Sequence, residues 1–219
     1  MVRKQLKRSY RISRYVVYKE TLIDYREKLW SFVGSFLGIG IIAAIQSFFL
    51  NAHDNLFLIG SFGASSVLIY GVIQSPLAQP RNLLGGHLVS ALVGVTVAQV
   101  LPDILWITAP LAVSLSILGM QFTKTLHPPG GATALIAVSG SEQIKAMGYL
   151  YVLYPVLAGV IILLLVALLV NNITSQRVYP NDGRFSRTFN WFLNPVRTQS
   201  VQIKRGRRLR RLKRQIRRR

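Results

Sequence analysis

The stretch KTLHPPGGATALIAV, from Lys124 to Val138, decides how this chain has to fold. It is mostly apolar, yet two prolines and two glycines stand near its start, where they would break a membrane helix. Of the 219 residues, 51% are hydrophobic, and the mean hydropathy is +0.36. This composition is typical of a membrane protein rather than of a soluble domain. The stretch therefore predicts an interrupted passage through a bilayer.

Charged residues gather at the two ends of the chain. Residues 1–28 hold nine basic and three acidic residues, and residues 171–219 hold fifteen and one. Residues 29–170 hold three of each, and none of these six interrupts an apolar run. Because an ionised group is costly in hydrocarbon, runs free of charge are what a bilayer requires. We expect a basic cytoplasmic N-terminal segment (1–28), a transmembrane domain (29–170) and a basic cytoplasmic or interfacial C-terminal tail (171–219).

Several kinds of chemistry are missing from the chain. There is no cysteine, which excludes disulfides and thiolate metal sites. The N-terminus has no short apolar region followed by a small-residue cleavage site, so we expect it to be retained. Hydrolysis would need a nucleophile, base or metal cluster, and scattered histidines without a carboxylate do not supply one. We expect no enzyme, no cofactor and no metal site.

Six apolar segments could cross the membrane. A helix needs about 20 apolar residues for a hydrocarbon core of about 30 Å. Four segments come close to this length: 30–50, 83–101, 104–122 and 149–170. Segments 56–72 and 126–139 are interrupted, but they can cross if part of each is extended, because extended chain advances about 3.3 Å per residue. Such backbone is tolerated only inside protein or beside a watery cavity, so each marks an internal site.

The charges between the segments favour six crossings. With both termini inside, Arg81 and Lys124 lie in inner loops. The outer loops hold Asp54, Asp103, and Glu142 with Lys145. This agrees with the preference of positive residues for the cytoplasm. The predicted fold is an all-α polytopic membrane bundle of six segments with broken second and fifth segments. The alternative is four full spans plus two re-entrant half-helices, and a four-crossing topology would place Arg81 and Lys124 outside.

The chain contains a weak internal repeat. GASSVLI from Gly63 resembles GATALIA from Gly131, and SALVGV from Ser90 resembles PVLAGV from Pro155, at offsets of 68 and 65. Two copies follow, residues 30–101 and 104–170. Three crossings in each copy would make them inverted repeats, an architecture typical of transporters. The alternative is chance similarity between membrane segments rich in small residues.

The two broken segments predict a binding site for a small monovalent anion. We expect helices to begin at Gly63 and Gly131 and to meet near the bilayer midplane, where unpaired N–H groups and helix dipoles would face one pocket. No apolar segment holds a carboxylate, which disfavours a cation or proton carrier. The candidate binding residues are Gly63, Ala64, Ser65, Ser66, His127, Gly130, Gly131, Ala132 and Thr133.

The residues around the prolines have more than one interpretation. Pro128 and Pro129 lack an N–H and fix φ, so the chain before them stays extended and a helix can begin after them. His127 either binds the anion or only orients the loop. A vestibule at the inner mouth is predicted from Arg81, Asn82, His87 and Lys124. Ordinary topology-setting charges are the alternative for Arg81 and Lys124, and structural packing is the favoured role for His87.

Three motifs resemble those of a known family. The stretches FGASSVLIYG, SPLAQPRNLLGGHLVSALVGV and TLHPPGGATAL are similar to signature regions of the HPP family of integral membrane proteins, named for its His-Pro-Pro triplet. The resemblance covers residues 30–170. Members of this family are usually described as having four transmembrane helices, and they occur in bacteria and in plant chloroplasts. The resemblance also implies nitrite as the substrate. Many bacterial members carry a regulatory CBS region, whereas this chain ends in a basic tail.

The C-terminal stretch KRGRRLRRLKRQIRRR, residues 204–219, has eleven basic residues in sixteen. Its Leu209, Leu212 and Ile216 would share one helical face, which indicates binding to anionic membrane lipids. Contact with nucleic acid or the ribosome is the rival, since phosphate attracts any dense arginine run. No motif for reading bases is present, so we expect no sequence-specific nucleic acid partner.

The sequence thus predicts a transporter or channel for a small inorganic anion, with nitrite named by the resemblance. We expect it in the plasma (inner) membrane of a prokaryote with both termini cytoplasmic. The alternative is a membrane scaffold or sensor that does not transport and acts through its basic tail. Glycines such as Gly34, Gly38 and Gly94 permit close helix contact within the chain or between copies, which leaves a homo-oligomer open.

Overall fold

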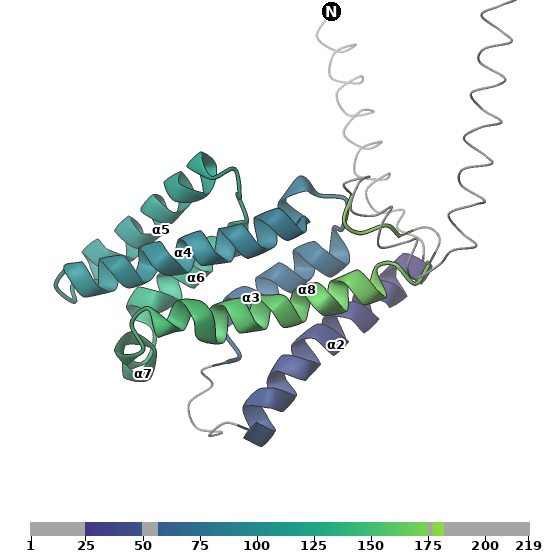
Figure 1. The fold of residues 1–219 in the computed structure, drawn as a ribbon, viewed down its shortest axis with the longest axis horizontal. Coiled ribbons are helices and arrows are strands. Elements are labelled where there is room, and N and C mark those ends of the chain that lie inside the picture. The colour runs from purple at the N-terminus through teal and green to yellow at the C-terminus, as the bar shows by residue number, and fades with distance from the viewer. Residues whose placement is uncertain (1–24, 50–56, 175–176, 182–219) are drawn as a thin grey trace, which may run out of the picture.

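The computed structural model describes residues 25–49, 57–174 and 177–181, and the elements within these ranges are all helical (Figure 1). The all-α prediction is therefore confirmed for the described part of the chain. The basic residues before Tyr25 and the tail 204–219 lie outside it, as do His53 and Asp54. The α-helices are α2 (Tyr25–Phe49), α3 (Gly60–Ser66), α4 (Pro80–Val100), α5 (Leu105–Phe122), α6 (Pro128–Ser139), α7 (Glu142–Ala146) and α8 (Ala158–Val170).

Four helices are long and apolar enough to cross a membrane. They are α2, α4, α5 and a helix over Val152–Val170. This last helix consists of the π-helical segment η3 (Val152–Leu157) followed by α8. These correspond to the four full spans predicted from the charge-free runs. The last is interrupted at Tyr154, whose φ of −138° and ψ of 121° are extended. Pro155 follows, and a proline disfavours helical backbone at the residue before it.

The two short helices begin three residues before the predicted positions. α3 begins at Gly60 and continues into the π-helical segment η1 (Val67–Gly71). α6 begins at Pro128. The predicted starts at Gly63 and Gly131 are therefore wrong. His127 is extended as expected, with φ −141° and ψ 104°, but the prolines form the first turn of the helix rather than preceding it. Proline is accepted there because the first N–H groups have no partner within the helix.

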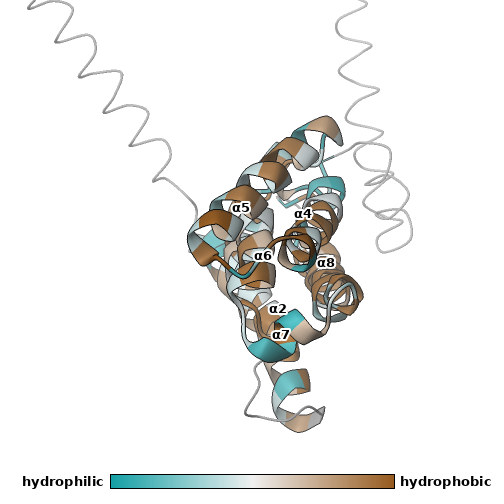
Figure 2. Cartoon of the chain, turned by 90° about the vertical axis from the view of Figure 1, so that its left-hand side faces the viewer, coloured by the Kyte–Doolittle hydropathy of each residue, from teal (hydrophilic) through white to brown (hydrophobic). Residues whose placement is uncertain are grey.

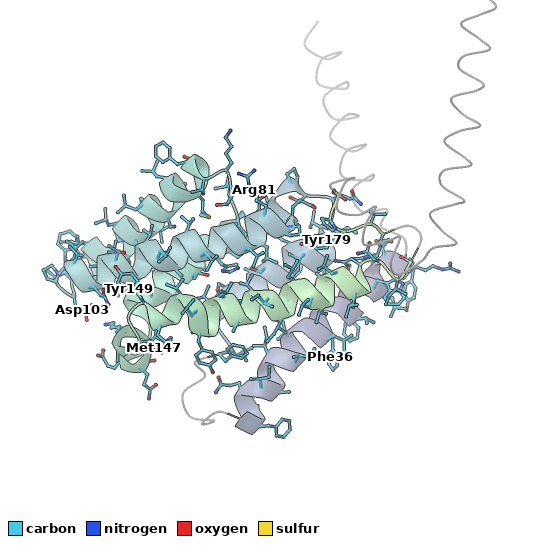
Figure 3. All side chains as sticks on the ribbon, in the orientation of Figure 1. Phe36, Arg81, Asp103, Met147, Tyr149 and Tyr179 are labelled. Atoms are coloured by element: carbon cyan, nitrogen blue, oxygen red, sulfur yellow. The ribbon has the colours of Figure 1, made fainter. Side chains whose placement is uncertain are left out.

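The bundle has two ends, which we name by the residues labelled in Figure 3. One end, which holds Arg81 and Tyr179, is called the Arg81 end (Figure 3). The opposite end, which holds Asp103, Met147 and Tyr149, is called the Asp103 end. At the Arg81 end the turn η2 (Pro76–Ala78) leads into α4. At the Asp103 end the short α7 joins α6 to η3.

The segment that contains α3 runs from the Asp103 end to the Arg81 end. The N–H of Phe57 donates to Gln46 Oε1 over 2.7 Å, near the end of α2. Thirteen residues later, the carbonyl of Tyr70 accepts from Ser31 Oγ over 2.8 Å, near the start of α2. Since the fifteen residues between Ser31 and Gln46 advance about 22 Å in a helix, residues 57–70 lie antiparallel to α2 over most of its length.

Helix α6 runs in the opposite direction, alongside α4. Asn82 Nδ2, near the start of α4, donates to the carbonyl of Leu126 over 2.7 Å. Near the end of α4, Val97 packs in one buried cluster with Val138 of α6. Each short helix therefore leads the chain toward the opposite end of the bundle from the other, α3 toward the Arg81 end and α6 toward the Asp103 end.

Helix α4 packs against α5 and α6, while α2 packs against α8 (Figure 1). One large buried cluster joins α2, α3, η1 and α8, and a smaller one lies between α4, α5 and α6. The long helices are hydrophobic over most of their surface, and the hydrophilic colour gathers at α7 and the connecting loops (Figure 2). Exposed apolar side chains such as Phe32, Trp106 and Leu165 are what a lipid-facing surface requires.

Several glycines allow close contact between helices of the same chain. A Cβ at Gly34 or Gly38 of α2 would meet the ring of Tyr70. A Cβ at Gly94 of α4 would lie 2.7 Å from the carbonyl oxygen of Ala134 on α6, and one at Gly159 of α8 would meet the ring of Phe62 on α3. The predicted glycine contacts thus form within the chain.

Candidate functional site

Four polar side chains meet in the interior of the bundle. Ser65 comes from α3, His87 from α4, His127 from the residue before α6, and Thr133 from α6. All four are fully buried. We call them the polar cluster. Polar and ionisable groups among membrane-spanning helices are costly, so such a group marks a functional site by default.

Short hydrogen bonds connect the four side chains. Ser65 Oγ lies 2.7 Å from Nε2 of His87 and 3.0 Å from Nε2 of His127. His87 Nδ1 lies 2.7 Å from Thr133 Oγ1, and His127 Nδ1 lies 2.8 Å from the carbonyl oxygen of Leu77. The centroids of the two rings are 5.0 Å apart. The chain of bonds therefore passes Thr133, His87, Ser65, His127 and Leu77 in that order.

When both histidine rings are neutral, the carbonyl of Leu77 determines which atom donates in each of these hydrogen bonds. The carbonyl of Leu77 can only accept, so His127 carries its proton on Nδ1 and its Nε2 accepts from Ser65. Ser65 has one hydroxyl proton, so its oxygen accepts from Nε2–H of His87. His87 Nδ1 then accepts from the hydroxyl of Thr133. The two neutral rings must therefore be opposite tautomers.

Glycines bring the backbones of α4 and α6 close enough to form the cluster. A Cβ at Gly86 would meet His127 and lie 2.9 Å from the carbonyl oxygen of Thr125. A Cβ at Gly130 would lie 2.7 Å from Ser90 Oγ and 2.9 Å from the carbonyl oxygen of Gly86. Gly130, predicted to bind the anion, thus lies against α4 and permits close packing at this point.

Two buried hydroxyls beside the cluster have no hydrogen-bond partner. They are Ser61 Oγ and Ser90 Oγ, both fully buried. Ser61 precedes Ser65 by one turn of α3, and Ser90 follows His87 by one turn of α4. Because α3 and α4 run in opposite directions, both serines lie on the Asp103 side of the cluster. Sequence reasoning missed them, although the four-residue spacing of Ser61 and Ser65 is a signal of a shared helix face.

The predicted glycine positions do not lie in the cluster. Gly63 and Ala64 are exposed, and Gly63 lines a groove of about 520 Å³ between α2 and α3 together with Ser66. A Cβ at Gly131 would meet Val113 of α5, and Ala132 beside it is half-buried. The expected pairing of Gly63 and Gly131 around one hollow is therefore not what the contacts show.

The beginning of α6 also offers fewer free N–H groups than predicted. Pro128 and Pro129, its first two residues, have none. The N–H of Gly130 already donates to the carbonyl of His127 over 2.8 Å. The expectation of an amide-rich helix start is therefore wrong for α6.

The predicted vestibule residues lie together at the Arg81 end, with one exception. Arg81 Nη2 donates to the carbonyl of Thr123 over 3.0 Å, Asn82 donates to Leu126, and Lys124 is exposed. His87 is instead fully buried in the polar cluster. Its assignment to the vestibule is wrong, because it lies two turns into α4.

A strap of residues 177–181 packs over the Arg81 end. Arg177, with only 1% of its surface exposed, donates to Glu27 Oε2 over 3.1 Å, to the carbonyl of Tyr70 over 2.6 Å and to Asn171 Oδ1 over 2.8 Å. Burial lowers the pKa of Arg177, while the charge of Glu27 raises it, and an arginine stays charged in any case. This buried ion pair was missed, because the sequence places Arg177 in the basic tail.

The same strap holds the loop that ends the polar cluster. The hydroxyl of Tyr179 donates to the carbonyl of Ala78 over 2.7 Å, next to Leu77. The N–H of Asn181 donates to Gln79 Oε1 over 2.8 Å. The carbonyl that accepts from His127 is therefore positioned by the C-terminal strap.

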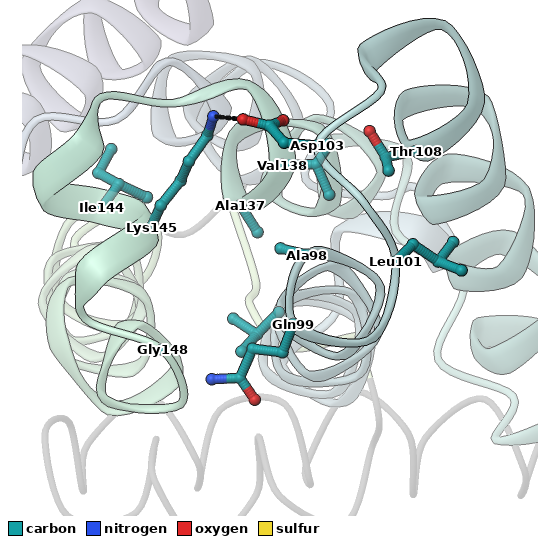
Figure 4. Close-up of a pocket in the computed structure, with 11 residues that line it drawn as sticks. Ala98, Gln99, Leu101, Asp103, Thr108, Ala137, Val138, Ile144, Lys145 and Gly148 are labelled. Atoms are coloured by element: carbon teal, nitrogen blue, oxygen red, sulfur yellow. Dashed lines mark hydrogen bonds and ion pairs between the residues drawn. The ribbon is translucent and has the colours of Figure 1, made fainter.

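A small cavity of about 100 Å³ opens at the Asp103 end (Figure 4). It is lined by the end of α4, α6 and α7, and Lys145 Nζ bonds to Asp103 Oδ2 over 2.7 Å beside it. The hydrogen bond that Lys145 donates to the Asp103 carboxylate raises the pKa of Lys145, which is therefore positively charged. Within the described ranges, no group of three or more His, Cys, Asp or Glu side chains could hold a metal ion.

Comparison with known proteins gives a family but no solved relative. A family model described as "HPP, transmembrane region" matches residues 20–180. Two transmembrane proteins of Dictyostelium discoideum are 49% identical over 160 residues and 50% identical over 162 residues. Each alignment covers 72% of this chain but 51% and 56% of the relatives, so the chain spans about half the length of the curated relatives it matches. No solved structure matches.

Proposed function

This chain belongs to the HPP transmembrane family, and from that premise we propose that it passes a small monovalent anion, nitrite, through its polar cluster. That it is an integral membrane protein follows from the family and from its four long apolar helices. Nitrite itself comes from the family resemblance, and the residues alone support only a small anion.

The polar cluster is the observation that carries the proposal. Its four side chains are buried and bonded to one another, and beside them the hydroxyls of Ser61 and Ser90 have no protein partner and can donate to the oxygens of a small anion. The three carboxylates among the described residues are engaged elsewhere. Glu27 pairs with Arg177, and Asp103 and Glu142 pair with Lys145. No negative charge in the described part of the chain therefore opposes an anion at the cluster.

Features on both sides of the cluster support a path for the anion. Arg81 and Lys124 are cations at one end, and Lys145 is a cation beside the cavity at the other. The unpartnered hydroxyls of Ser61 and Ser90 lie on the Asp103 side of the cluster, the side on which that cavity opens. Buried polar atoms without a protein partner are ordinarily satisfied by water or a ligand.

The contacts also support the inverted repeat and six crossings. Ser65 and Thr133 are equivalent at the offset of 68, and both bond to His87, one on each ring nitrogen. Gly94 and Gly159 are equivalent at the offset of 65. Each lies against the short helix of the other half, α6 for Gly94 and α3 for Gly159. In the same way, α2 packs on α8 and α5 packs on α4.

The membrane and the orientation remain predictions. The positive-inside preference places the Arg81 end and both termini in the cytoplasm. The plasma membrane of a prokaryote was expected, and the relatives named above come from Dictyostelium discoideum. Protease protection of tags at either terminus in sealed vesicles tests the orientation.

Flux through the purified protein in liposomes tests the function. Nitrite, nitrate, formate and chloride are compared, with protein-free vesicles as the blank. Thr133→Val removes a hydroxyl of the cluster at constant shape, and we expect it to lower nitrite flux about tenfold, the cost of one unmade bond to a charged group. Thr96→Val is the matched control, because Thr96 lies on the exposed face of α4.

Two results would overturn the proposal. One is the absence of protein-dependent flux for all four anions, which would favour the scaffold or sensor that works through its basic tail. The other is unchanged nitrite flux in Thr133→Val, which would move the path away from the polar cluster.

A further inference from the structure

We propose that the polar cluster binds one proton with each anion, and that His87 and His127 share this proton through the hydroxyl of Ser65. The inference rests on the proposed function and adds the coupling ion to it. The absence of membrane carboxylates argued against a proton carrier in the sequence. The two buried rings, whose closeness no local sequence pattern indicates, provide the alternative.

The cluster can accept one proton without losing a hydrogen bond. In the neutral state His87 Nδ1 accepts from Thr133. A proton from water, added at that nitrogen, makes His87 a donor at both nitrogens, to Ser65 Oγ and to Thr133 Oγ1. The hydroxyl of Thr133 then turns toward the carbonyl of Pro129, which lies 3.4 Å away. Every donor in the charged cluster thus still faces an acceptor.

The proton can then pass to the second ring through Ser65. The Nε2–H bond of His87 breaks as its proton moves to Ser65 Oγ, and the original hydroxyl proton of Ser65 moves to His127 Nε2. His127 becomes the cation, and it donates to Ser65 and to Leu77. The distances of 2.7 and 3.0 Å are those of existing hydrogen bonds, so no heavy atom has to move. Two protons shift by one bond each, and the total charge is unchanged.

A second proton is disfavoured by the first. The ring centroids are 5.0 Å apart, and two like charges at that distance inside a protein repel strongly. In the doubly charged state both Nε2 atoms would also be donors toward Ser65 Oγ, with its own hydroxyl proton left without a ring acceptor. The cluster therefore holds one excess proton, not two.

Among the described residues, none supplies a counter-ion for that proton. The neighbours facing the two rings are the edge of Phe62, the hydroxyls of Ser65 and Thr133 and the carbonyl of Leu77. Tyr151 adds a hydroxyl that donates to the carbonyl of Thr133 over 3.1 Å. The nearest cations by sequence, Arg81 and Lys124, are exposed at the Arg81 end. All three described carboxylates are paired with cations elsewhere.

This arrangement couples the proton to the anion. A lone cation is costly in an apolar interior, and so is a lone anion, whereas the pair together is neutral. Each ion therefore raises the affinity for the other by the same factor. The hydroxyls of Ser61 and Ser90, on the Asp103 side of the rings, are donors free to receive the anion. The proposed cargo is one proton with one monovalent anion.

The net charge that crosses the membrane with each nitrite distinguishes proton-coupled transport from transport of nitrite alone. Vesicles that hold the protein are clamped at chosen voltages with potassium and an ionophore, and an internal dye reports pH. We expect one proton to enter with each nitrite, at a rate that does not change with voltage. Protein-dependent nitrite flux that follows voltage and carries no proton would overturn the coupling alone. Loss of all protein-dependent flux would instead overturn the proposed function.

Substitution of Ser65 tests the bridge. Ser65→Ala removes the shared oxygen, and we expect proton-coupled nitrite flux to fall at least about tenfold, while Ser65→Thr restores a hydroxyl and part of the flux. Ser35→Ala is the matched control, because Ser35 is a half-buried serine of α2 whose hydroxyl donates to the carbonyl of Phe32 in the same helix. Equal flux in Ser65→Ala and the control would overturn the bridge.

Nitrogen NMR of labelled histidines in lipid bilayers tests the same inference without transport. His53→Gln leaves only the two rings of the cluster. We expect opposite neutral tautomers, with the proton on Nε2 in His87 and on Nδ1 in His127, and the appearance of one doubly protonated ring when nitrite is added. Two rings of the same tautomer, or no response to nitrite, would overturn the proposal even if Ser65→Ala failed to fold.

Discussion

The Arg177 site and the polar cluster are both buried, both polar and both tied to backbone carbonyls, but only one contains a charge pair. Arg177 is a permanent cation, and Glu27 lies 3.1 Å from it. His87 and His127 are neutral in the hydrogen-bond arrangement described above, and the three carboxylates in the described ranges pair with cations elsewhere. On the proposed coupling, a fixed charge in this bundle is balanced by the protein, whereas a transient one is left for a ligand to balance.

The two sites also differ in what they connect. Arg177 joins the start of α2, the end of η1 and the residues after α8, three places where helices end. The polar cluster joins α3, α4 and α6 in the interior of the bundle. We therefore expect the first to govern stability and the second to govern transport, and three changes test this division.

Removing the fixed cation should have the largest effect. Arg177→Met leaves Glu27 without its partner and the carbonyl of Tyr70 without its shortest bond, and breaking a buried ion pair costs about 3 to 5 kcal/mol. Because Glu27 is partly exposed, we expect the lower end of this range. Tryptophan fluorescence during thermal unfolding in detergent measures the loss.

Arg81→Met is the matched control, since Arg81 is exposed and makes one bond to a carbonyl. If both variants lowered the unfolding temperature equally, Arg177 would be an ordinary surface arginine and the contrast between the two sites would fail.

A carboxylate introduced beside the polar cluster should remove the difference between the two sites, because the cluster would then also contain a charge pair. Ser61→Asp introduces a negative charge one turn from Ser65, which would hold the excess proton and occupy the place of the anion. We expect nitrite flux to fall about tenfold or more, comparable with the loss of one charged hydrogen bond. Nitrogen NMR should then show a doubly protonated ring without nitrite.

Ser61→Asn has nearly the same shape without the charge and serves as the control. Equal losses of flux in the two variants would mean that size, not charge, is responsible. A neutral pair of rings in Ser61→Asp would argue against the transient cation.

Much of the bundle was predictable because the bilayer imposes simple requirements on a sequence. The charge-free runs 83–101 and 104–122 became α4 and α5 with boundaries shifted by a few residues. The starts of α3 and α6 were misplaced because glycine and proline were taken as breaks between elements. In the fold, Pro128 and Pro129 open the helix, where the missing N–H costs nothing.

The polar cluster was only half predictable. Ser65, His127 and Thr133 were named from their positions beside the two glycines, but His87 was assigned to packing and the vestibule. A single histidine on an apolar helix carries no local signal, and its partners lie 22 and 46 residues away along the chain. Arg177 was hidden for another reason: charge counts cannot distinguish one buried arginine from its solvated neighbours in a basic tail.

Breaking the ion pair between Lys145 and Asp103, whose carboxylate side chain is 67% exposed, should change stability least of the three tests. Lys145 and Asp103 lie 2.7 Å apart, closer than Arg177 and Glu27, yet solvent and salt screen them. We expect Lys145→Met to leave the unfolding temperature unchanged at neutral pH and at both low and high salt. Because Asp103 raises the pKa of Lys145, any contribution is complete below the ordinary lysine value of 10.5 and is lost as the pH rises above it. A loss in Lys145→Met as large as that in Arg177→Met would mean that distance rather than burial decides the strength of ion pairs in this protein.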